Sequence, residues 1–209
     1  MSVSQTHTLS TVPRSRRCGI SIVTLQRPIA QAGFSLVEVS IVMAIVLLLA
    51  VIAIPTVRSY VIESKVPKVG EELVRFVMHT RINAVHSSGA PYDSVANSSL
   101  ANMLGESGIL TVVGSGASAV VRHGLGKDGE VSVAQADSGT AFTLTLTNVN
   151  RAACPSIASM LQRLADTVTL TPHGGAATAV KNSSKPYNAL DTEKQCSSGD
   201  SNSFTFTMS

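Results

Sequence analysis

An uninterrupted apolar run near the N-terminus constrains this chain more than any other feature. All fourteen residues from Ile41 to Ile54 are apolar. The wider stretch Phe34–Val57 adds only five interruptions, which are Ser35, Glu38, Ser40, Pro55 and Thr56. As a helix, this stretch would be about 36 Å long at about 1.5 Å per residue. Because a hydrocarbon core is roughly 30 Å thick, the sequence predicts a membrane-spanning helix over residues 34–57.

Positive charge is concentrated before this run. Residues 1–33 contain four arginines and no acid, whereas the other 176 residues contain 12 basic and 13 acidic side chains. Basic flanks stay on the cytoplasmic side of a membrane, so residues 1–33 are predicted to be cytoplasmic and the C-terminal part to be exported. Without those residues the chain is nearly neutral. We therefore expect no nucleic-acid partner, since such a protein needs many basic residues to neutralise phosphates.

Glu38 lies inside the predicted spanning helix. At the centre of such a helix a carboxylate costs roughly 2.5–3.5 kcal/mol, and less near an end. One interpretation is that Glu38 reaches water at the cytoplasmic interface; the other is a functional site. The residues before it are Gly33 and Phe34, and Glu38 follows the glycine by five positions. This combination, at the mouth of a long apolar helix and after basic residues, resembles the processing site of type IV prepilins.

The resemblance implies how the N-terminus is processed. A prepilin peptidase would cut between Gly33 and Phe34, remove residues 1–33 as a leader and methylate the new amine of Phe34. A glycine suits the cleavage position because the absence of a Cβ lets the backbone enter a peptidase cleft. Family members also often have a proline part-way along the helix. Pro55 fits that place and would kink the helix, although it also fits a simple end of the span.

The resemblance also implies a function for Glu38. In this family the glutamate of one subunit pairs with the N-terminal amine of a neighbour, which removes the cost of two unpaired charges in an apolar environment. The chain would then be the structural subunit of a type IV pilus, most like the type IVb class, and not an enzyme. Expected partners are copies of itself, the prepilin peptidase, the inner-membrane assembly machinery and, before assembly, membrane lipid. The expected locations are the bacterial inner membrane and then an extracellular filament.

After Pro55 the helical pattern becomes amphipathic. Apolar residues recur at three- and four-residue intervals from Ile62 to Phe76, and charged residues occupy the other faces. This pattern predicts that the helix continues over 58–86 and packs one stripe on a globular head, residues 87–209. The predicted fold class is α+β: a long N-terminal helix packed on an antiparallel sheet.

The head is predicted to contain short strands separated by glycine-rich turns. The strand candidates are Ala119–Arg122, Glu130–Ala134, Phe142–Thr147, Thr167–Thr171 and Ser203–Met208. Helices are expected at Ser98–Leu104 and Pro155–Ala165, the second with a proline in its first turn. The tract His173–Gly199 is polar and is predicted to be irregular.

Two of the three cysteines, Cys154 and Cys196, lie in the predicted exported part, where disulfides persist. A bridge between them would contribute roughly 4 kcal/mol by closing the intervening loop. Two free thiols are the alternative. Pilin heads often have one C-terminal disulfide, so the resemblance also implies the bridge. Cys18 lies in the predicted leader.

Other functions find little support in the sequence. The five histidines lack a close zinc-ligand spacing, and neither a nucleophile elbow nor a full phosphate-binding glycine motif occurs. We therefore expect no catalytic residue, metal or cofactor. The alternatives are a type II secretion pseudopilin, a membrane-anchored or secreted enzyme, and a DNA-binding minor pilin. A calcium loop would favour the pseudopilin, but the C-terminal stretch after Cys196 offers only Asp200.

Overall fold

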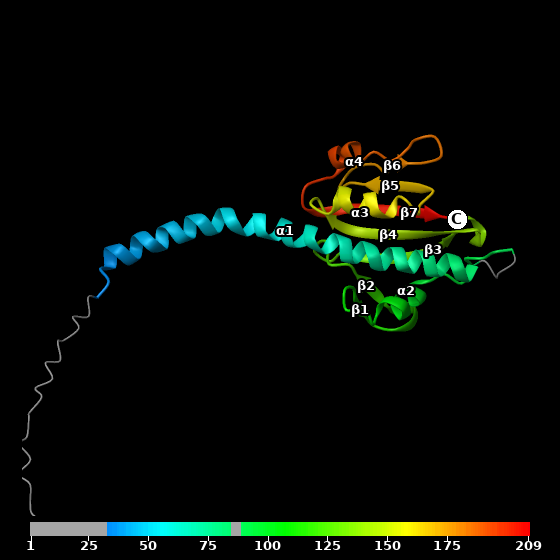
Figure 1. Ribbon diagram of the computed structural model, residues 1–209, viewed down its shortest axis with the longest axis horizontal. Coiled ribbons are helices and arrows are strands. Elements are labelled where there is room, and N and C mark those ends of the chain that lie inside the picture. The colour runs from blue at the N-terminus through cyan, green and yellow to red at the C-terminus, as the bar shows by residue number, and fades with distance from the viewer. Residues whose placement is uncertain (1–32, 85–88) are drawn as a thin grey trace, which may run out of the picture. The chain divides into compact units, whose positions relative to one another are not determined.

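The structure is a computed structural model and describes residues 33–84 and 89–209 (Figure 1). Residues 1–32 of the predicted leader, Cys18 among them, lie outside the described residues. The predicted end of the long helix, at residues 85 and 86, lies outside them as well. The chain divides into two compact units, Met1–Ala44 and Ile45–Ser209, and each is described by itself.

The long helix α1 runs from Leu36 to Ala84. Its second half carries a stripe of buried apolar side chains at three- and four-residue spacing: Ile62, Val66, Val69, Leu73, Phe76, Val77 and Ala84. These are the positions at which the sequence pattern predicted the packed face. Because side chains three and four residues apart share one face of a helix, this stripe can cover a sheet continuously.

The head contains a seven-stranded antiparallel sheet in the order β1-β2-β3-β4-β7-β5-β6 (Figure 1). The strands are β1 (Thr111–Val113), β2 (Val120–Arg122), β3 (Glu130–Ala136), β4 (Ala141–Asn150), β5 (Thr167–Thr171), β6 (Thr178–Lys181) and β7 (Asp200–Met208). The last strand of the chain lies between β4 and β5, so residues distant in sequence form the centre of the sheet. The predicted α+β class is confirmed.

Two cross-strand rows of apolar residues form the sheet side of the core. In one, β4 pairs Leu144 with Phe206 of β7, which in turn pairs with Val168 of β5. In the next row Leu146 and Leu170 flank Phe204 in the same way. All six side chains are completely buried. The alternating threonines on these strands are only partly buried, as expected for the other face of an antiparallel sheet.

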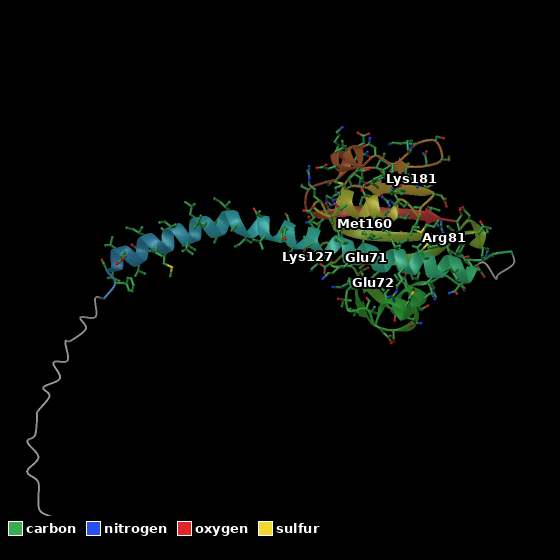
Figure 2. The ribbon with its side chains drawn as sticks, in the orientation of Figure 1. Glu71, Glu72, Arg81, Lys127, Met160 and Lys181 are labelled. Atoms are coloured by element: carbon green, nitrogen blue, oxygen red, sulfur yellow. A yellow bond between two sulfur atoms is a disulfide. The ribbon has the colours of Figure 1, made fainter. Side chains whose placement is uncertain are left out.

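Shorter helices complete the head: α2 (Asn97–Leu104), α3 (Cys154–Leu161), α4 (Ala189–Gln195) and the 3₁₀ turns η1 (Gly116–Ser118) and η2 (Asp137–Gly139). Helix α3 packs closely against α1 at Gly70. A Cβ on Gly70 would lie 2.6 Å from the Cε of Met160, so the missing side chain makes room for that methionine (Figure 2).

Most predicted elements occur, with some corrections. The strand Thr167–Thr171 is found at the same residues, and Ser203–Met208 forms most of β7. The tract His173–Gly199 was wrongly predicted to be irregular, because it contains β6 and α4. Strand β1 was not predicted, and the helix expected at Pro155–Ala165 ends at Leu161. The missed elements β1, β6 and α4 are short, with three to seven residues each. Segments of this length show little periodicity in the sequence, and packing against neighbouring elements stabilises them.

Candidate functional site

The chain enters α1 through three residues without regular structure, Gly33, Phe34 and Ser35. The carbonyl of Ser35 accepts a hydrogen bond from the N–H of Val39 at 3.1 Å, which begins the helical pattern. Phe34 is 80% exposed, and a Cβ on Gly33 would meet no atom within 4 Å. Contacts within the described part of the chain therefore do not require a glycine at position 33.

Glu38 lies in the first turn of α1, where the positive end of the helix dipole stabilises a carboxylate. The residue is exposed, and among the described residues it forms no ion pair. It lines a shallow hollow of about 270 Å³ together with Phe34, Val39 and Met43. The carboxylate thus lies one helical turn after Phe34, beside an otherwise apolar surface.

The first half of α1 exposes its apolar side chains on all faces. An 18-residue window reaches a mean hydropathy of 3.0, and none of that window is buried within the chain. By length and composition the helix can cross a membrane. An apolar surface of this extent has to be covered, either by lipid or by other protein chains.

Helix α1 is continuous through position 55 and also through Pro67. The kink expected at Pro55 stays a prediction.

Cys154, the first residue of α3, is bonded to Cys196, which directly follows α4. Both residues are buried in the hydrophobic core. The bridge attaches the tract between β6 and β7 to α3. The same tract has a second source of order. The Asn188 side chain caps α4 by accepting hydrogen bonds from the N–H groups of Leu190 and Asp191.

Asp200, which the sequence offered only as a poor calcium ligand, has a structural role. Its carboxylate accepts hydrogen bonds from Arg58 of α1 and from the side chain of Asn150, each at 2.5 Å. The same residue begins β7. Within the described part of the chain, no cluster of three or more metal-ligating side chains occurs.

Sequence reasoning missed His123, which is 1% exposed in the loop after β2. Its Nε2–H donates to the carbonyl of Thr147 at 2.8 Å, and its Nδ1 accepts from the N–H of Leu125 at 2.9 Å. These two bonds require the neutral ring. A Cβ on Gly129 would lie 2.3 Å from the ring, so this glycine makes room for it. The only signal in the sequence is the glycine-rich loop after β2, and that pattern predicts a turn but not a buried histidine.

Burial lowers the pKa of His123 below its ordinary value of 6.5, and the hydrogen bond to Thr147 opposes this effect. The unfolded chain therefore binds a proton near pH 6.5 that the folded chain does not bind. We expect the free energy of unfolding to fall as the pH drops below about 6.5, by at most about 1.4 kcal/mol per pH unit. Above that pH the residue contributes no pH dependence. Urea unfolding of the detergent-solubilised chain, with His123→Gln as the non-titrating reference, measures the effect. A constant difference between the two proteins from pH 5 to 8 would contradict it.

Two models of known protein families match this chain, one over the start of α1 and one over the head. A model described as the prokaryotic N-terminal methylation motif matches residues 29–54. A second model, described as PilS N terminal, matches residues 77–209, almost two thirds of the chain. The chain belongs to the PilS family. The methylation motif makes this PilS-family protein a type IV prepilin and the structural subunit of a pilus, which is not an enzyme.

Among solved structures, the PilS-family chain is similar to one titled as the type IV b pilin from Salmonella typhi. The two share 20% identity with a TM-score of 0.46, and the match covers 66% of this chain and 94% of that one. A search of curated proteins finds no match. The prepilin motif implies processing by a prepilin peptidase, membrane anchoring and assembly into a polymer.

Proposed function

We propose that the chain is cut between Gly33 and Phe34, methylated on the amine of Phe34, held in the inner membrane by residues 34–57 and then assembled into an extracellular type IV pilus of the type IVb class. Residues 1–33 would be the leader, 58–86 the amphipathic half of the helix and 87–209 the head. Lipid covers the apolar helix before assembly, and like helices cover it afterwards.

The observation that carries this proposal is the exposed, apolar first half of α1, with a single carboxylate in its first turn. A helical segment with apolar residues on all faces does not belong at a water-exposed surface, and none of the described residues covers this one. Glu38 would be costly in lipid unless it met a cation. Cleavage before Phe34 creates that cation, because it frees an α-amine. Assembly then brings the amine of one subunit to the carboxylate of the next.

The decisive measurement is the N-terminus of the mature protein, by intact mass and peptide mass spectrometry on sheared filaments or membranes. We expect a chain that begins at Phe34 and carries one additional methyl group. A start at Met1 or beyond Ala53 would overturn the processing proposal and leave a plain anchored or secreted protein.

Gly33→Val provides a control for cleavage. Because a Cβ at position 33 meets no atom within 4 Å, we expect the substitution to leave the fold intact and to affect only cleavage. We expect the Val variant to stay in the membrane with its leader attached.

A further inference from the structure

Met160 of α3 packs its thioether end onto the buried face of α1. A Cβ on Gly70 would lie 2.6 Å from the methionine Cε and 2.7 Å from its Sδ. Gly70 is buried and adjoins Val69 of the apolar stripe, and Figure 2 shows Met160 beside this part of α1. The sulfur therefore occupies the space that a side chain at position 70 would take.

The same side chain borders solvent. Met160 is only partly buried, and it lines a surface hollow of about 650 Å³ between α1 and α3. The lining combines apolar Val74 with the charged groups of Glu71, Arg75 and Arg163. A small molecule that enters the hollow can thus reach a sulfur atom that also takes part in a helix–helix contact.

The position of Met160 differs from that of other methionines of the chain. Met208 is completely buried, whereas Met78 is 45% exposed on α1. Met103 of α2 resembles Met160 most, because it is also partly buried and lines a hollow, of about 450 Å³. That second hollow lies against the C-terminal end of α1.

We propose that Met160 is an oxidation site whose state controls the packing of α3 on α1. The oxidant is a two-electron oxygen donor such as hydrogen peroxide. The sulfur attacks one peroxide oxygen, an S–O bond forms as the O–O bond breaks, and the products are methionine sulfoxide and water. The sulfur is oxidised by two electrons, and the peroxide is reduced by two.

The sulfoxide does not fit the place of the thioether on Gly70. Its oxygen is a polar acceptor, and it would lack a donor against apolar neighbours such as Ile157, whose Cδ1 would lie 3.6 Å from a Cβ at position 70. Donors line the hollow, since Arg75 and Arg163 have guanidinium N–H groups there. The oxidised side chain therefore turns from Gly70 toward these arginines, and the space that it leaves weakens the contact between the helices.

Hydrogen exchange of the full chain, purified in detergent and treated with hydrogen peroxide, tests the site. We expect the peptide that contains Met160 to gain one oxygen and the amides of α3 to exchange about tenfold faster, as in a locally weakened element. Met160→Leu keeps an apolar side chain of similar volume, so its α3 should exchange at one rate with and without peroxide. Met160→Gln places a polar group at the site and should exchange rapidly even without peroxide.

Met103→Leu is the matched control, because it removes a methionine of similar burial from the other hollow. Its α3 should respond to peroxide as wild type does. Each sample must keep the Cys154–Cys196 bond, so that faster exchange does not reflect a lost bridge. In wild type, the fraction of fast-exchanging chains should equal the fraction with oxidised Met160, which tests the site without any substitution.

Oxidised Met160 with unchanged exchange in α3 would overturn the proposal. A Met160 that stays unmodified after Met103 has gained an oxygen would overturn it too, as would a Met160→Leu variant that still responds to peroxide. These outcomes leave the pilus role untouched, because the experiment needs no filaments.

Discussion

Filaments should fail to form when Glu38 is replaced by Ala, although the variant still inserts into the membrane and is processed. The substitution leaves the Phe34 amine of the neighbouring subunit without a partner in an apolar environment. An unpaired charge there costs roughly 2.5–3.5 kcal/mol, so assembly should fall on the order of a hundredfold. The yield of sheared filament, relative to the mature subunit left in the membrane, measures the effect.

Two variants sharpen this experiment. Glu38→Gln keeps the size of the side chain and removes its charge, so it should fail as Ala does. Ser40→Ala removes a polar side chain two residues away, whose hydroxyl donates only to the carbonyl of Val37 within the same helix. It should assemble normally. Normal filaments from Glu38→Ala would remove the pairing role.

Loss of the disulfide should cause the largest fall in stability. The bond closes a loop with a sequence separation of 42 residues. By chain entropy, its removal in the double variant Cys154→Ser, Cys196→Ser should lower the free energy of unfolding by about 4 kcal/mol. That is a large share of the roughly 5–15 kcal/mol typical of a folded protein. Urea unfolding of the detergent-solubilised chain measures the loss.

The third cysteine provides the matched control. Cys18 precedes the proposed cleavage position, so Cys18→Ser should leave the mature chain identical to wild type. Treatment of the wild-type chain with a reductant should reproduce the effect of the double variant. A change below about 1 kcal/mol in the double variant would show that the loop is ordered by its other contacts, among them the Asn188 cap.

The buried groups of the head were the least predictable from the sequence. His123 gave no signal as a lone histidine, because its burial depends on Thr147 on another strand and on the space left by Gly129. Arg81 and Lys181 both donate to backbone carbonyls of the segment after α3, although 100 positions separate them in the sequence. Such convergence depends on tertiary packing, and no local pattern reports it.

The sequence by itself predicted the long N-terminal helix of this protein and the features around its start. The apolar run and the arginines before it are local features, so they predict a spanning helix without any tertiary contact. The spacing from Gly33 to Glu38 is local too, and it carries the resemblance to type IV prepilins. The same holds for the buried stripe of α1, whose helical period is a property of neighbouring residues. Only the tertiary structure decided the sheet order, with β7 between β4 and β5. Strand pairing joins residues that are far apart in the chain. A short strand does not determine its partner by its own sequence, because the pairing depends on which side chains are buried together in the core.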